Sequence, residues 1–220
     1  MRAQSISFAP VFERNDMELY LIRHGECDKA QMGYFDTEKN YMDQPLTAKG
    51  QLQAERLAER LKSVSFNAVY ASDLIRAQET AERLLNAQTR KPEYVVDKRL
   101  REIDMGDVLK TSWDGFPEQY EKWKLHEEDL PYPNGESGAD VWNRCGTLAE
   151  ELLQKPGARI AAVCHGGVIR SLLCGLFQIP QARRFLFGMP LENCSVTVVK
   201  QEDGQRYLHT LNDHAHLIGI

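Results

Sequence analysis

Short apolar runs alternate with longer amphipathic stretches along the chain, and this alternation constrains the fold more than any other feature of the sequence. The apolar runs lie at 17–22, 67–71, 94–96 and 159–164, and each is short enough for a buried strand. Helical spacing of apolar residues marks the stretches at 47–62, 72–86, 137–154 and 166–177. Strands that alternate with helices predict an α/β fold, here a three-layer α/β/α sandwich in which helices cover both faces of a mostly parallel sheet.

Polar residues that can cap helices precede three of the amphipathic stretches. Thr47 and Ser137 are the expected N-caps of the first and third helices, and Ser72 or Asp73 is that of the second. Each of these helices should therefore begin directly after its capping residue and pack one apolar face against the sheet. The buried face of the first helix is expected to consist of Leu52, Leu57, Ala58 and Leu61.

The remaining segments are two long loops and a closing pair of strands. The loops span 23–46 and 97–136, the second with one short helix near 116–126, and we expect substrate specificity to reside in them. Strands at 194–199 and 206–211 close the sheet around an intervening Glu-Asp-Gly turn. The length of 220 residues fits a single domain over 17–220, preceded by an N-terminal extension at 1–16.

Charge and cysteine usage narrow the function classes. A formal net charge of −5 provides no overall attraction to nucleic acid or to anionic membranes. Residues 1–16 lack the apolar run of a secretory signal, and no segment reaches the roughly 18 apolar residues of a membrane helix. The five cysteines are odd in number and form no Cys-x-x-Cys pair, which favours free thiols in a reducing compartment. We therefore expect a cytoplasmic protein with no nucleic-acid or membrane partner, in which positive charge for an anionic ligand must be local.

Cationic and imidazole side chains follow three of the predicted strands. Arg23 and His24 end the first strand, Arg76 lies in the first turn of the helix after the second, and His165 and Gly166 follow the strand at 159–164. In parallel sheets, ligands bind beyond the carboxyl ends of the strands. A guanidinium group matches phosphoryl oxygens, and helix N-termini add N–H donors. If these strands are neighbours, their ends form a site for a phosphoryl group.

The stretch "VCHGGVIR" at 163–170 admits a rival interpretation. It contains Cys-x-x-Gly-x-x-Arg, the minimal pattern of a loop in which a cysteine thiolate attacks a phosphate ester, here with Cys164 and Arg170. Such loops usually have a histidine before the cysteine to lower the thiol pKa, and Val163 occupies that position. The rival also leaves His24 without a role. We expect Cys164 to end a buried strand and point away from the pocket, and Arg170 is not required to face the phosphate.

Several segments together resemble the histidine phosphatase superfamily, also called phosphoglycerate mutase-like. The segments that carry the resemblance are "LIRHGE" at 21–26, "PLTAKG" at 45–50, "SDLIRAQETA" at 72–81, "LRE" at 100–102, "GES" at 135–137 and "VCHGGVI" at 163–169. They occur in the family's order and, with the ending at 212–217, span nearly the whole predicted domain. A lone Arg-His-Gly would be a weak signal, whereas the ordered set is specific.

The resemblance implies a phosphatase-like mechanism that needs neither metal nor cofactor. His24 is the implied nucleophile, which carries the phosphoryl group as phosphohistidine. Arg23, Arg76 and His165 are implied to hold the phosphoryl oxygens, with Gly166 among the substrate-binding residues. The arginines supply the positive charge that magnesium supplies in other phosphotransfer enzymes.

The resemblance leaves two assignments with alternatives, the acid and one phosphate contact. Glu102 is the implied general acid and base, and Asp104 is the second candidate. Many family members carry an asparagine six residues after the nucleophile, but this chain has Ala30 there. The missing oxygen contact is then expected from the 27–46 loop, with Gln31 or Asn40 as candidates.

The segment after the acid bears on the reaction type. Family phosphatases often continue with Gly-x-Trp-Glu-Gly and the mutases with a longer insertion, whereas this chain reads "GDVLK" at 106–110. The missing insertion favours hydrolysis of a small phosphorylated metabolite over mutase-type transfer. A catalytically inactive phosphate-binding member is a further alternative. Homodimers occur in the family, but no feature of this sequence specifies one. A metal cluster of His209, His214 and His216 is disfavoured.

Overall fold

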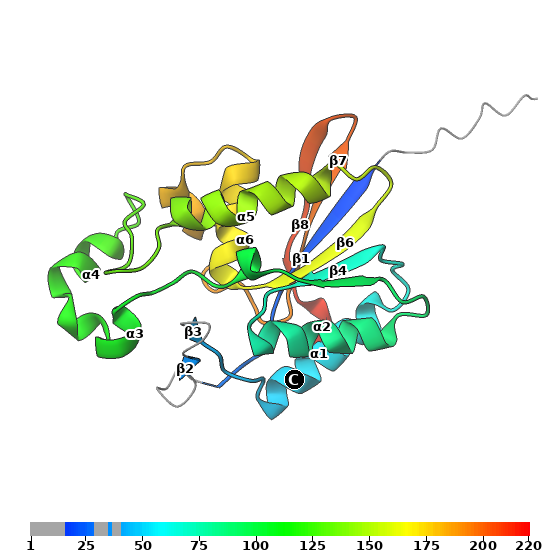
Figure 1. The fold of residues 1–220 in the computed structure, drawn as a ribbon, viewed down its shortest axis with the longest axis horizontal. Coiled ribbons are helices and arrows are strands. Elements are labelled where there is room, and N and C mark those ends of the chain that lie inside the picture. Colours follow the sequence, from blue (N-terminus) through cyan, green and yellow to red (C-terminus); the bar gives the residue numbers. More distant parts are fainter. Residues whose placement is uncertain (1–15, 29–34, 37–40) are drawn as a thin grey trace, which may run out of the picture.

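A six-stranded mixed sheet forms the centre of the computed structural model, which describes residues 16–28, 35–36 and 41–220 (Figure 1). Its strands are β1 (Met17–Arg23), β4 (Ala68–Ala71), β5 (Glu93–Val96), β6 (Arg159–Cys164), β7 (Val196–Glu202) and β8 (Gln205–Asp213). The strand order is β5-β4-β6-β1-β7-β8. The first four strands in this order are parallel, and β7 and β8 are antiparallel, so the predicted mostly parallel sheet is confirmed.

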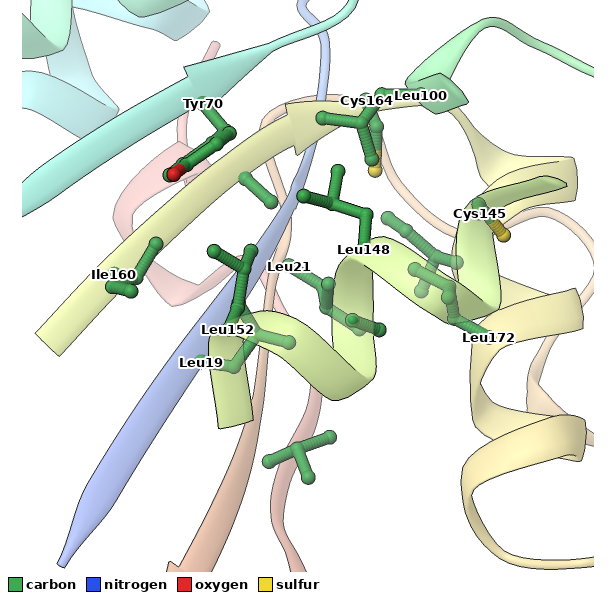
Figure 2. Close-up of a cluster of buried hydrophobic side chains, with 14 of the residues drawn as sticks. Leu19, Leu21, Tyr70, Leu100, Cys145, Leu148, Leu152, Ile160, Cys164 and Leu172 are labelled. Atoms are coloured by element: carbon green, nitrogen blue, oxygen red, sulfur yellow. The ribbon is translucent and has the colours of Figure 1, made fainter. Parts of the chain in front are cut away.

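Helices cover both faces of the sheet, as the alternating pattern predicted. One face carries α1 (Ala48–Leu61) and α2 (Ile75–Ala87), and the other carries α5 (Gly138–Leu153) and α6 (Gly166–Leu176) (Figure 1). Each face has its own cluster of buried side chains. Leu57 and Leu84 belong to the cluster under α1 and α2, and Leu148 and Leu172 belong to the cluster under α5 and α6. Figure 2 shows this second cluster, in which Leu21 of β1 lies beside Leu148 of α5.

The pairing of β1 with β6 sets the geometry at the carboxyl-terminal ends of the parallel strands. The two strands are parallel and in register, with Arg23 opposite Cys164. The backbone N–H of His24 continues the ladder, donating to the carbonyl of Cys164 at 3.0 Å. On the other side of β6, the N–H of Ser72 donates to the carbonyl of Val163 at 3.0 Å. The residues that leave β1, β4 and β6 therefore emerge side by side.

Two of the three expected helix caps are confirmed. The side chain of Thr47 accepts the N–H of Gly50 at 3.0 Å. Ser137 and Asp140 form a reciprocal capping box at the start of α5.

The expected cap of α2 is wrong, because that helix begins later. Ser72 accepts the N–H of Leu74 and Asp73 forms an ion pair with Arg101, so neither caps the helix. The carboxylate of Asp43, 32 positions earlier, accepts the N–H of Ile75 at 2.6 Å. A local pattern cannot reveal a cap that comes from a distant loop.

Leu52 is not part of the buried face of α1. Its side chain is 38% exposed, whereas Leu57, Ala58 and Leu61 are buried as expected. Gly50, Gln53 and Ala54 complete the buried face of this helix.

The 97–136 segment extends beyond the sheet and contains two short helices (Figure 1). They are α3 (Val108–Thr111) and α4 (Pro117–Trp123), where the sequence predicted one helix near 116–126. A ring contact joins α4 to the following turn, since the Trp123 ring lies 5.2 Å from that of Tyr132. The 23–46 loop contains a small hairpin of β2 (Phe35–Asp36) and β3 (Tyr41–Met42). In the described part of the chain, no helix is long and apolar enough to cross a membrane.

Replacing Gly175 with alanine should destabilise the fold through Trp142. A Cβ atom at position 175 would lie 2.2 Å from Cδ2 of the Trp142 indole, so α5 and α6 would have to separate. Overpacking of this kind costs about 1–3 kcal/mol. Urea unfolding of Gly175→Ala should therefore show a lower free energy of unfolding than the unmodified chain. In a Trp142→Ala background the penalty should disappear, and an equal penalty in both backgrounds would contradict this packing.

Candidate active site

The predicted phosphoryl-binding residues lie together at the ends of β1, β4 and β6. His24 follows β1, Arg76 lies in the first turn of α2, and His165 is the N-cap of α6. All three are buried, with exposed fractions of 4%, 6% and 0%. The ring centroids of His24 and His165 are 5.0 Å apart. The structure thus brings side chains 141 positions apart into one pocket, as the strand-end argument predicted.

Hydrogen bonds select the tautomer of His24. Its Nδ1 lies 2.7 Å from the carbonyl oxygen of Gly25, and a carbonyl only accepts, so Nδ1 carries the hydrogen. Its Nε2 accepts the Nε–H of Arg76 at 3.3 Å. Burial, and secondarily the charges of Arg76 and Arg23, hold the pKa of His24 well below its usual 6.5. His24 is therefore a neutral imidazole with its lone pair on Nε2, which is the form that can attack phosphorus.

The loop that carries His24 is held by hydrogen bonds from α1 and α2. The N–H of Gly25 donates to Oγ1 of Thr80 at 3.1 Å, and that of Glu26 donates to Oε1 of Gln53 at 2.8 Å. A Cβ atom on Gly50 would lie 1.9 Å from the carbonyl oxygen of Glu26, so α1 packs directly against the loop. These contacts give a structural reason for the "PLTAKG" and "SDLIRAQETA" segments of the sequence.

Arg76 is fixed by partners that leave one face of its guanidinium directed at His24. Its Nη1 donates to the carbonyl of Met42 at 3.1 Å and to Oε1 of Gln44 at 3.2 Å. Burial lowers its pKa from the usual 12.5. In the part of the chain that the structure describes, no carboxylate forms an ion pair with Arg76. The guanidinium therefore keeps its charge available to an anion.

Buried donors without partners surround His24. The Nε of Arg23 and both ring nitrogens of His165 are buried, and no described residue bonds them. Burial, followed by the charge of Arg76, holds the pKa of His165 well below 6.5, so this ring is neutral and provides one N–H donor. Because buried donors without acceptors are rare in folded proteins, these atoms indicate a site for an anion with several oxygens.

Glu102 lies at the N-terminus of α6, next to His165. Its Oε1 accepts the N–H of Gly167 at 3.0 Å and that of Ile103 at 2.8 Å. Asp104, the alternative acid, accepts the N–H of Gly106 at 2.8 Å within its own turn. The carboxylate of Glu102 is thus held two residues from His165, whereas that of Asp104 is engaged in its own turn, and the geometry favours Glu102.

Two residues that the sequence argument missed hold the acid segment in place. Arg144 of α5 donates to the carbonyl of Glu102 at 3.0 Å and pairs with Glu136 at 2.6 Å. The hydroxyl of Tyr41 donates to the same carbonyl at 2.9 Å. An arginine inside an otherwise apolar helix face could have signalled such a role, whereas nothing local distinguishes Tyr41.

The candidates for the missing asparagine contact, Gln31 and Asn40, and Ala30 itself lie outside the described residues. Gln44, at the described end of the same loop, contacts Arg76 and was not predicted.

Cys164 packs into the core beneath α5. Its side chain is 0% exposed, and it lies near Leu100 in the cluster of Figure 2. Burial raises the pKa of its thiol far above the usual 9.0, which removes the thiolate that a cysteine phosphatase requires. The expectation that Cys164 ends a buried strand is confirmed.

A metal-based site is not supported within the described residues. No three histidine, cysteine or acidic side chains among them are grouped to hold a metal ion, His209, His214 and His216 included.

Comparisons with known proteins agree with the motif-based resemblance. A model of the histidine phosphatase superfamily (branch 1) matches residues 19–214. A probable phosphoglycerate mutase GpmB of Salmonella choleraesuis (strain SC-B67) is 32% identical over 212 residues, which cover 91% of this chain and 95% of that protein. The structure of a mycobacterial glucosyl-3-phosphoglycerate phosphatase superposes with a TM-score of 0.75 at 27% identity, over 90% of this chain and 99% of that one. A putative alpha-ribazole-5'-P phosphatase from Escherichia coli gives 0.73 at 27% identity, over 90% and 97%.

Gly167→Ala should displace the acid without unfolding the protein. A Cβ atom there would lie 2.4 Å from Oε1 of Glu102, and the mobile end of that side chain can move away. We expect kcat for phosphate-ester hydrolysis to fall about 100-fold or more, the usual contribution of a general acid. Combining Gly167→Ala with Glu102→Gln should cost little more than Glu102→Gln alone. Fully additive losses would show that the two residues act separately.

The buried histidines should make the fold sensitive to mild acid. His24 and His165 stay neutral in the folded protein below pH 6.5, whereas the unfolded chain protonates them there. The unfolded state then binds more protons, so the free energy of unfolding should fall as the pH drops from about 7 to about 5, by up to ~1.4 kcal/mol per pH unit for each histidine. His165→Gln should flatten this slope in urea unfolding at several pH values, with the exposed His209→Gln as matched control. Equal slopes for His165→Gln and the unmodified chain would count against neutral burial.

Proposed function

We propose that this chain, which belongs to the histidine phosphatase superfamily, is a metal-independent phosphomonoesterase that hydrolyses a small phosphorylated metabolite through phosphohistidine at His24. One observation carries the proposal: a neutral imidazole that has its lone pair on Nε2 lies among buried donors that lack acceptors. This arrangement suits a phosphoryl group, whose oxygens need donors and whose phosphorus needs a nucleophile.

In the first step, Nε2 of His24 attacks phosphorus and the bond to the ester oxygen breaks. The phosphoryl oxygens accept hydrogen bonds from Arg23, Arg76 and His165. The Nε–H of Arg76 then donates to the substrate instead of to Nε2 of His24, which frees the lone pair of Nε2. Glu102 in its acid form gives a proton to the leaving alkoxide. The products are an alcohol and phosphohistidine.

In the second step, water attacks the phosphorus of phosphohistidine. The Glu102 carboxylate removes a proton from that water, the phosphorus–nitrogen bond breaks, and inorganic phosphate leaves. The electron pair returns to Nε2 of His24, and Glu102 is again in its acid form. The position of Glu102 beside Gly167, one residue beyond the His165-Gly166 step, supports its action in both steps.

Hydrolysis is favoured over phosphoryl transfer. The 97–136 segment lacks the mutase-type insertion, and two of the similar solved structures are described as phosphatases. Transfer of the phosphoglycerate mutase type is the second candidate, because the similar Salmonella protein is named a probable mutase. A cytoplasmic location and a homodimer belong to the same proposal; the five unpaired cysteines support the location.

Phosphate release from p-nitrophenyl phosphate tests the proposal. The unmodified chain should turn over without added metal, and His24→Ala should lower the rate by at least about a thousandfold, as loss of a covalent nucleophile does in other enzymes. Cys164→Ser and Cys164→Ala should keep most of the activity. Activity that survives in His24→Ala, or that is lost in both Cys164 variants while they remain folded, would contradict the mechanism.

An assay with 3-phosphoglycerate as substrate distinguishes hydrolysis from phosphoryl transfer. If interconversion with 2-phosphoglycerate outpaces phosphate release, the mutase alternative holds instead.

A further inference from the structure

Arg170 of α6 is a cation that the proposed reaction does not use and that the fold leaves only partly bonded. Its Nη1 donates to the carbonyl of Gly188 at 3.2 Å. Its Nε is buried without a partner. In the described part of the chain, no carboxylate pairs with it and no residue accepts from Nη2.

A neighbouring arginine shows how this fold neutralises a cation in the same surroundings. Arg170 and Arg184 both lie against the ring of Phe185, at 5.0 and 4.8 Å from its centre. Arg184 forms an ion pair with Asp129 at 2.5 Å, whereas Arg170 has no such partner. A desolvated charge without a counterion is costly, and burial lowers the pKa of Arg170. The missing counterion therefore needs an explanation.

The guanidinium of Arg170 borders the phosphoryl pocket. A Cβ atom placed on Gly166 would lie 3.7 Å from Nη1 and Nη2 of Arg170 and also 3.7 Å from Nε of Arg23. Both guanidinium groups, each with a buried Nε that no described residue bonds, thus flank the residue after His165. The charges that act most on Arg170 are those of Glu102 and Arg23, followed by Tyr132. Since Glu102 protonates the leaving oxygen, Arg170 lies on the side of the leaving group.

The open edge of Arg170 has a defined shape. Since Nη1 is committed to Gly188, the Nε–H and one Nη2–H remain, and these two donors are parallel. Two parallel N–H groups match the two oxygens of a carboxylate. Tyr132, which is 7% exposed, lies near enough to act on the charge of Arg170.

We propose that Arg170 is a specificity-determining residue that binds a carboxylate on the leaving group of the substrate, within a few bonds of the ester oxygen. The inference rests on the proposed phosphatase function and names its substrate class: small phosphomonoesters that carry a carboxylate. It agrees with the sequence-based expectation that Arg170 is not required to face the phosphate. Arg23, Arg76 and His165 hold the phosphate, and Arg170 binds the carboxylate on the neighbouring leaving group.

Two probe esters of similar size test this role, 3-phosphoglycerate and glycerol 3-phosphate, which differ in a carboxylate against a hydroxymethyl group. Phosphate release should give a kcat/KM about ten- to hundredfold higher for the carboxylate ester, the range expected for charged hydrogen bonds. Arg170→Gln should bring the ratio near one by raising KM for 3-phosphoglycerate, with values for glycerol 3-phosphate within about twofold of the unmodified chain. Arg170→Lys, which keeps the charge but loses the fork, should fall between them.

Arg183→Gln is the matched control, because it removes the same charge from an exposed neighbouring position and should change neither ester. Thermal unfolding of each variant checks that it folds, and Arg170→Lys carries the test if Arg170→Gln does not. An unchanged ratio in the Arg170 variants overturns the inference. An equal loss of kcat on both esters with a displaced pH profile also overturns it, because Arg170 would then act through Glu102.

Calorimetric binding to His24→Ala separates this inference from the proposed function. Tighter binding of 3-phosphoglycerate than of glycerol 3-phosphate, lost with Arg170→Gln, supports the carboxylate site even if no ester is hydrolysed. Equal binding of the two esters overturns it while phosphatase activity stands. Absence of phosphate release from every ester by the unmodified chain overturns the proposed function alone.

Discussion

The parallel pairing of β1 with β6 is the interaction on which the site depends. In-register pairing places Arg23 opposite Cys164, and the next residue of each strand is a histidine. The ring centroids of these histidines then lie 5.0 Å apart, because the strand pairing alone places the two residues next to each other. A shift of one residue in this register would turn each side chain to the opposite face of the sheet. The buried cores on both faces make such a shift unfavourable, so the packing that stabilises the fold also positions the nucleophile.

The positive charge of the pocket comes from arginines that have no carboxylate partner. Arg23, Arg76 and Arg170 form no ion pair within the described residues, whereas nearby Arg101 and Arg144 each pair with a carboxylate. The unpaired group concentrates positive charge inside a chain whose net charge is −5. Burial, followed by the charges of Arg76 and Arg23, keeps the pKa of His24 low and its imidazole neutral. A bound phosphate ester would supply the missing anion.

The sequence predicted what depends on local pattern and strand order. The strands, the two-sided helix layers and the convergence of His24, Arg76 and His165 follow from periodicity and from residues at strand ends. Contacts between distant segments could not be predicted in this way: Asp43 caps α2 from 32 positions away, and Arg144 holds the backbone of Glu102 from another helix. The position of the Arg170 guanidinium could not be predicted for a related reason. Its spacing from His165 shows which turn of the helix it occupies, but only the packing against Phe185 shows where its guanidinium lies.

The central claim is that His24 carries the phosphoryl group. Rapid quenching of the enzyme in alkali during turnover of a phosphate ester, followed by peptide mass spectrometry, tests it directly, because phosphohistidine survives alkali. We expect a phosphoryl group at Nε2 of His24, on the peptide that contains this residue. We expect none when the enzyme is quenched without substrate. A phosphoryl group on Cys164, or steady turnover with no phosphorylated histidine at any quench time, would contradict it.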